Sequence, residues 1–200
     1  MLFGNMPLSM SHLISTITAD FPFHVPEADQ TAFLSRTLER LGRSLNYKVS
    51  CARSCDSFGR SGASLALRWW EPGRGTICAA ECEWGVAGDV ATAFERLMSV
   101  KAPLKLLIFH SRRIGFERED IWLRTDVDAI MKAIGAALLD FGQHVEGEVY
   151  LLLERVERES GFRSYEFHVP ASGKLSVEFE QAARLFRQIG ASPAVAVAAG

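Results

Sequence analysis

Residues 76–85 read Thr76-Ile77-Cys78-Ala79-Ala80-Glu81-Cys82-Glu83-Trp84-Gly85, and this stretch decides the predicted fold. It opens with apolar and small residues and ends with two acids two positions apart, which is typical of a strand leaving a buried sheet. Because strand side chains alternate between faces, we expect Glu81 and Glu83 on one face with Ile77 and Ala79, roughly 6.5 Å apart along the backbone. Hard divalent ions prefer carboxylate oxygens, so the pair predicts a site for Mg2+ or Mn2+.

The sequence on either side predicts how this strand is paired. Residues 64–70 read as a preceding strand, and the Pro- and Gly-rich residues 71–75 read as the turn of an antiparallel hairpin. A turn centred near Gly73 puts the two acids opposite roughly Leu65 and Ala63. A helix over 89–99 and an apolar strand over 104–109 follow, and this order predicts a parallel crossover back into the sheet.

The rest of the chain is divided by the same periodicities into an N-terminal arm (1–25), one domain (26–190) and a small, apolar tail (191–200). The further elements expected are a short helix at 11–18, a helix from Pro26 to Gly42, a strand at 47–52, a helix from Thr125 or Asp126 to Phe141, an antiparallel pair at 148–156 and 162–169, and a last helix from Ser176.

These elements and motifs resemble the core of restriction-endonuclease-like proteins, the PD-(D/E)xK nuclease superfamily. The resemblance covers about residues 30 to 110 and rests on Glu81-x-Glu83-Trp84-Gly85, on residues 94–98 and on residues 100–105. It implies an α/β (α+β) fold with an α-β-β-β-α-β core, a mixed central sheet flanked by helices. The later helix, hairpin and last helix would then extend that core.

The resemblance also implies a site. Glu81 and Glu83 would bind Mg2+ or Mn2+ with Asp56 as a further ligand, and the metal would activate water for phosphodiester hydrolysis. Lys101 would replace the motif lysine, whose place is taken by Glu83, and would stabilise the developing phosphate charge. The catalytic set is therefore expected to be Glu81, Glu83 and Lys101.

The sequence departs from the family pattern at the motif aspartate. No acid occurs between Ser57 and Trp70. Either Ser64 stands at that position, or Asp56 reaches in from the preceding loop. Glu39 on the first long helix is a further candidate acid, because some members of the superfamily supply a glutamate there.

Three functions follow from these alternatives. The first is a metal-dependent nuclease acting through Glu81 and Glu83. The second is a catalytically inactive domain of the same fold that acts as a binding or assembly module. The third is an unrelated α/β domain in which both glutamates are ordinary surface acids.

Composition and charge limit the partners. The formal net charge is −2 and the pI about 6.2, so bulk charge does not favour nucleic-acid binding. A local patch at Arg112 and Arg113 offers phosphate contacts, although a solvated loop explains it too. No feature supports a homo-oligomer. The lack of a long apolar run and of a basic leader predicts a cytoplasmic protein without a membrane segment.

Two of the cysteines, Cys78 and Cys82, and three of the tryptophans are interpreted as packing residues. The spacings Cys51-x3-Cys55 and Cys78-x3-Cys82 are wider than those of most zinc knuckles, and a strand cysteine behaves as a small apolar side chain. The tryptophans at 69, 70 and 84 are expected in the core, rather than stacked on bases.

Overall fold

The central strand of the protein is β4 (Leu104–Ser111), and all of its residues are buried. A strand buried on both faces is typical of a parallel sheet covered by helices on both sides. The computed structural model describes residues 9–54, 64–111, 113–114, 124–125, 127–141, 144–156 and 160–173.

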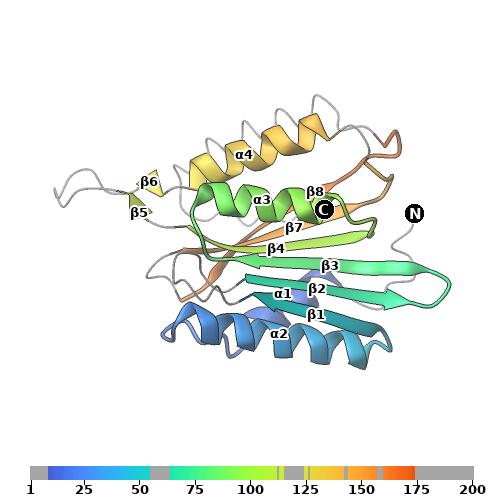
Figure 1. Ribbon diagram of the computed structural model, residues 1–200, viewed down its shortest axis with the longest axis horizontal. Helices are drawn as coiled ribbons and strands as arrows, with labels where there is room; N and C mark the ends of the chain where they lie inside the picture. Colours follow the sequence, from blue (N-terminus) through green and yellow to red (C-terminus); the bar gives the residue numbers. More distant parts are fainter. Residues whose placement is uncertain are drawn as a thin grey trace.

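Six strands form one mixed sheet around β4, in the order β1-β2-β3-β4-β7-β8 (Figure 1). Its other members are β1 (Lys48–Ser54), β2 (Ser64–Glu71), β3 (Gly75–Glu83), β7 (Val149–Val156) and β8 (Phe162–His168). β3, β4 and β7 run parallel, whereas β1, β2 and β8 each pair antiparallel with their neighbours. β5 (Arg113–Ile114) and β6 (Arg124–Thr125) form a separate small pair, which the sequence did not predict.

Helices cover both faces of the sheet, so the protein has three layers (Figure 1). α1 (Met10–Thr18) and α2 (Glu27–Ser44) lie on one face, and α3 (Ala87–Met98) and α4 (Val127–Asp140) lie on the other. Each face has its own apolar core. Strand alternation divides the residues of β4 between them: Leu104, Leu106 and Ile108 pack toward α1 and α2, and Leu107 and Phe109 pack toward α3 and α4.

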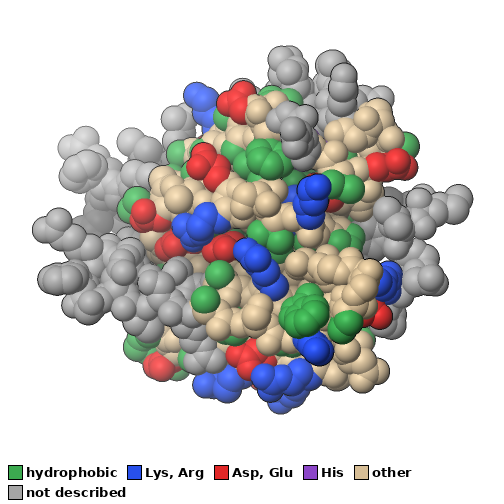
Figure 2. All heavy atoms as spheres, turned by 45° about the vertical axis from the view of Figure 1, so that its right-hand side comes forward, with side chains coloured by type: hydrophobic (Ala, Val, Ile, Leu, Met, Phe, Trp, Pro, Cys, Tyr) green, Lys and Arg blue, Asp and Glu red, His purple; other side chains and the backbone are tan. Residues whose placement is uncertain are grey.

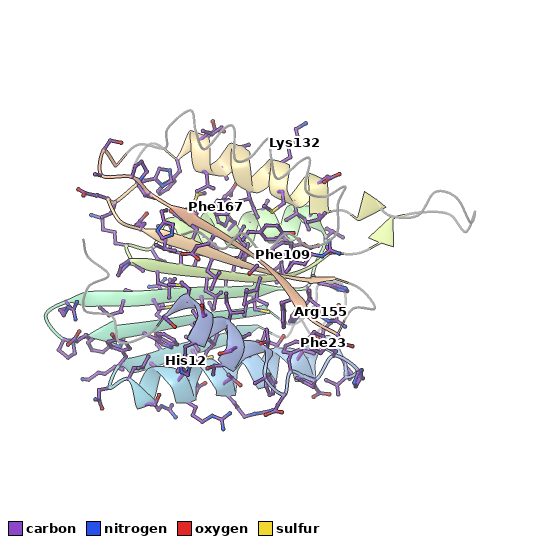
Figure 3. The ribbon with its side chains drawn as sticks, turned by 180° about the vertical axis from the view of Figure 1, so that it is seen from behind. His12, Phe23, Phe109, Lys132, Arg155 and Phe167 are labelled. Atoms are coloured by element: carbon purple, nitrogen blue, oxygen red, sulfur yellow. The ribbon has the colours of Figure 1, made fainter. Side chains whose placement is uncertain are left out.

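The N-terminal segment belongs to the first of these cores. Leu13 and Ile17 of α1 are fully buried in it. The Arg155 guanidinium of β7 donates to the Phe23 carbonyl at 3.1 Å, which ties the segment after α1 to the sheet (Figure 3). The predicted short helix is therefore present and packs on the domain.

The main elements confirm the predicted order. The helix after Pro26, the antiparallel hairpin, the parallel return into β4 and the antiparallel pair of β7 and β8 are all present. α3 begins at Ala87, two residues before the predicted start. The expected helix from Ser176 lies outside the described residues.

One detail of the predicted alternation is wrong. Ile77 packs with Cys78 in the α1/α2 core, whereas Ala79 packs in the α3/α4 core. A β-bulge between Trp69 and Trp70 explains the difference, because it shifts the register of the hairpin at this point. The same shift places Glu81 opposite Ala66, one residue from the predicted partner.

Most of the predicted packing residues are buried. Cys78 and Cys82 are free and buried, and Trp69 and Trp84 have no exposed surface. The prediction for Trp70 is wrong, because its side chain is 38% exposed, with the Lys48 ammonium above its ring. Cys55 lies outside the described residues. None of the described helices has the length and apolar character needed to span a bilayer.

Candidate functional site

The candidate site lies where β3 ends and the chain turns into α3. Glu81 Oε2 accepts a hydrogen bond from Arg96 of α3 at 3.1 Å. Glu83 lies two residues further along the same strand, so both carboxylates lie on the α3 side of the sheet. This agrees with the face on which the sequence placed the two acids.

The Glu81 carboxylate is partly buried and neutralised by protein groups. Its side chain is 11% exposed, against 49% for Arg96. Burial raises the pKa of Glu81, while the charge and hydrogen bond of Arg96, and the charge of Arg68, oppose that rise. Glu81 thus has a protein counter-ion already in place.

Glu83 holds the turn between β3 and α3. Its Oε1 accepts the Gly85 N–H at 2.9 Å, and Asp89 Oδ2 accepts the Val86 N–H at 3.1 Å. Val86 is the N-cap residue of α3, where unpaired N–H groups and the helix dipole favour negative charge, and Gly85 precedes it. Burial raises the pKa of Glu83, the Gly85 N–H opposes the rise, and the Asp89 charge adds to it. We call Glu81, Glu83, Asp89 and Arg96 the capping cluster.

Gly85 fits this cluster closely. A Cβ atom at position 85 would lie 2.3 Å from Asp89 Oδ2 and 2.8 Å from Asp89 Cβ. The side chain of Asp89 therefore occupies the space that any other residue at 85 would need. Trp84 points to the opposite face, where its Nε1 donates to Thr31 Oγ1 at 2.7 Å.

The other predicted site residues are not brought to this cluster. Lys101 precedes β4 and lies beside the end of β3 that is opposite Glu81. Along the chain, Lys101 is on the order of 15–20 Å from Leu107, the residue of β4 that pairs with Glu81. Glu39 lies on α2, which covers the other face of the sheet, and it pairs with Arg43 at 3.1 Å. Asp56 lies outside the described residues, as does the side chain of Ser64.

In the described part of the cluster, Glu81 and Glu83 each have one carboxylate oxygen held by a protein donor. Within the described ranges, no three His, Cys, Asp or Glu side chains are grouped to hold a metal ion. Mg2+ needs several free carboxylate or water oxygens around it. One oxygen of Glu81 is held by Arg96, and one oxygen of Glu83 is held by the Gly85 N–H.

A third acid, which the sequence interpretation missed, lies on the same face. Phe109 of β4 pairs with Glu83 on one side and with Glu154 of β7 on the other (Figure 3). The Cα atoms of the two glutamates are therefore roughly 10 Å apart. Glu154 is fully buried and accepts hydrogen bonds from Ser111 Oγ at 2.5 Å and from the Tyr165 hydroxyl. Hydroxyl donors thus satisfy Glu154 within the core.

A second charged cluster, also missed, lies at the other end of the parallel strands. Lys105 of β4 is 1% exposed, and its Nζ lies 3.0 Å from Glu148 Oε1 and 3.0 Å from the Tyr150 hydroxyl. Tyr150 in turn donates to Glu148 Oε2 at 3.2 Å and lies 3.4 Å from His144 Nδ1. We call Lys105, Glu148, Tyr150 and His144 the buried cluster.

Ionisation in the buried cluster is shaped by the lack of water. Burial lowers the pKa of Lys105, and the hydrogen bond and charge of Glu148 oppose that fall. Burial and the Glu148 charge raise the pKa of Tyr150 above its usual range. A lysine inside the apolar run from Leu104 to Phe109 was the sequence signal for this cluster.

The predicted arginine patch falls largely outside the described residues. Arg112 is not among them, and of Arg113 only the backbone, in β5, is described. A nucleic-acid contact at this segment therefore stays a prediction.

Comparison with known proteins adds no assignment. No protein-family model matches the chain, and no curated protein shows a significant sequence match to it. The function proposed for the chain thus depends on the geometry of its own residues.

Proposed function

We propose that the protein is a non-catalytic binding module built on a restriction-endonuclease-like core. The order β1-β2-β3-β4, with α2 on one face and α3 on the other, is the arrangement expected of that core and supports the fold part of the proposal. In this reading Glu81 and Glu83 have a structural role in place of a catalytic one.

The hydrogen bonding of Glu83 is the observation that carries the proposal. Glu83 is 6% exposed, and its carboxylate accepts the N–H of Gly85, so it caps the start of the connection to α3. A carboxylate that binds a catalytic metal needs its oxygens directed at the ion. Glu83 directs one of them at the backbone, and Glu81 directs one at Arg96.

A metal-dependent nuclease is the second candidate. It is favoured by the shared face of Glu81 and Glu83 and by the raised pKa of both, since perturbed carboxylates gather at catalytic sites. In that reading Asp56 completes the acidic set and Lys101 has to approach from the other end of β3.

One experiment separates the two functions. The purified chain is incubated with single- and double-stranded DNA and RNA in Mg2+ or Mn2+, and binding is followed by fluorescence anisotropy alongside cleavage. Glu81→Ala and Glu83→Ala are compared with Glu95→Ala, a matched control at an exposed acid on α3. We expect no cleavage by the wild type and no calorimetric Mn2+ binding that depends on Glu81 or Glu83.

One result would favour the metal-dependent nuclease over the non-catalytic module. Cleavage that requires the metal, disappears in Glu81→Ala and Glu83→Ala, and persists in Glu95→Ala would establish catalysis through the pair. Metal binding lost in the same two variants would also assign the pair as ligands.

A further inference from the structure

A pocket of about 750 Å3 opens at the end of the sheet opposite the capping cluster. It lies between the turn that joins β2 to β3, the segment that follows α3 and the segment that precedes β7. Figure 2 turns this side of the molecule forward and shows Lys and Arg side chains interspersed with apolar and acidic ones. Pockets of roughly 300–1,000 Å3 accommodate small organic ligands.

One side of the pocket is basic. Arg68 of β2, Arg74 of the turn and Lys101 line it. Arg74 is paired with Glu71 at 2.9 Å, whereas among the described side chains neither Arg68 nor Lys101 has a partner in an ion pair. Lys101 is thus available to a ligand, and Arg68, whose charge also acts on Glu81, has no ion-pair partner that would keep it from one.

The acidic groups of the pocket are largely neutralised. Glu148 is paired with Lys105 inside the buried cluster, which leaves Glu146 at the rim as an exposed acid. Lys105 also donates to the Met98 carbonyl in the last turn of α3 at 3.3 Å. It therefore offsets the negative end of that helix, which would otherwise repel an anion.

The rest of the lining is apolar. Val100, Ala102 and Pro103 follow α3, and Val145 is 45% exposed at the rim. A ligand that covers this exposed valine gains binding free energy, because removing apolar surface from water stabilises the complex by about 25 cal/mol per Å2.

We propose that this pocket binds a small amphipathic anion. Arg68 and Lys101 hold its carboxylate or phosphate head, and its apolar body lies against Val100, Pro103 and Val145. This assigns to Lys101 a role in ligand binding, at a site remote from Glu81 and Glu83. The proposal does not depend on whether those two glutamates are catalytic.

The test uses 8-anilinonaphthalene-1-sulfonate, an amphipathic anion whose fluorescence rises on binding. We expect saturable binding of the dye to the full chain. Decanoate and decyl phosphate, each below its micelle-forming concentration, are expected to displace it, and their relative strength distinguishes a carboxylate from a phosphate site. Decanol and inorganic phosphate, which lack the head and the tail respectively, are expected to be at least about tenfold weaker, a difference of roughly 1.4 kcal/mol.

Variants locate the binding site. Lys101→Glu and Arg68→Glu are expected to weaken dye binding about tenfold or more, and Val100→Trp to block it by filling the pocket. Lys132→Glu is the control, because Lys132 is exposed on α4, away from the pocket (Figure 3). Circular dichroism verifies folding, and Lys101→Gln with Arg68→Gln replaces any charge reversal that unfolds the chain.

Two results would overturn the proposal. The first is dye affinity unchanged in Lys101→Glu, Arg68→Glu and Val100→Trp while all three stay folded. The second is displacement by decanol as strong as that by decanoate, which would show that the charges play no part. Neither result bears on nuclease activity, so the two proposals fail separately.

Discussion

The capping cluster and the buried cluster each pair a glutamate with a cation, at opposite ends of the parallel strands. In the first, Arg96 is 49% exposed and Glu81 is 11% exposed. In the second, Lys105 and Glu148 are 1% and 3% exposed. When one partner of a solvent-exposed pair is removed, the protein loses little stability. When one partner of a buried pair is removed, the other is left as a buried charge without a counter-ion, and the loss of stability is large. The burial of each pair, more than its N–O distance, thus determines how much stability the protein loses when one partner is removed.

The largest effect is expected when the buried cluster loses its cation. Lys105→Met leaves the Glu148 carboxylate buried without its counter-ion and should lower the free energy of unfolding by about 3–5 kcal/mol. Urea denaturation at neutral pH measures this. The double variant Lys105→Met with Glu148→Gln removes both charges and should be more stable than the single variant. A single-variant loss below about 1 kcal/mol would show that the pair behaves like a surface pair.

Overpacking of the capping cluster should come next. Gly85→Ala places a methyl group against the Asp89 side chain, where the nearest atom is 2.3 Å away, and should destabilise the protein by about 1–3 kcal/mol. Gly88→Ala is the matched control within α3, because no atom lies within 4 Å of a Cβ there. That change should stabilise the helix by about 0.4–1 kcal/mol. Equal effects of the two substitutions on urea midpoints would contradict the close fit of Gly85.

Much of the fold follows from periodicity, and the exceptions have physical causes. The alternation along residues 76–85 places Glu81 and Glu83 on one face, and the apolar run at 104–109 predicts the strand β4. The pairing of β4 with β7 was not predicted, because partners far apart in sequence leave no periodic signal. The bulge at Trp69 moved Ile77 to the other face, since one inserted residue reverses the alternation.

The site was predicted only in part for a related reason. The sequence predicts where the two carboxylates lie on β3, but their hydrogen-bond partners come from other elements or from the backbone. Arg96 reaches Glu81 from α3, and the Gly85 N–H reaches Glu83 through a turn. Lys105 interrupts an apolar pattern, and its meaning depends on Glu148, which precedes another strand.

The capping cluster should also make stability depend on pH. Burial raises the folded-state pKa of Glu83 above 4.5, so the folded protein takes up a proton at a higher pH than the unfolded chain. Stability contributed by this group is therefore lost as pH rises from about 4.5 through the raised value. Glu83→Gln keeps an oxygen that can accept the Gly85 N–H but does not titrate. Its stability relative to wild type should be greater at pH 7 than at pH 4.5.

Urea midpoints of both proteins from pH 4 to pH 7 measure that difference. Glu95→Gln, at an exposed acid on α3, serves as the control and should follow the wild type across the range. A Glu83→Gln curve parallel to wild type would mean that Glu83 has the same pKa in both states.

The smallest effect on stability is expected at the exposed pair, Arg96 with Glu81. Arg96→Ala removes one hydrogen bond and one counter-ion from Glu81, but water reaches the arginine, so the loss of stability should be about 0.2–1 kcal/mol. The electrostatic consequence is more specific. Arg96 holds the pKa of Glu81 down against burial, so its removal should raise that pKa further. A carbon-13 NMR titration of the glutamate carboxyl groups in wild type, Arg96→Ala and Arg43→Ala measures the change, with Arg43 on α2 as the distant control. If the Glu81 resonance titrates at the same pH in all three proteins, Arg96 is not its counter-ion in solution, and the carboxylate would be open to the metal that the nuclease reading requires.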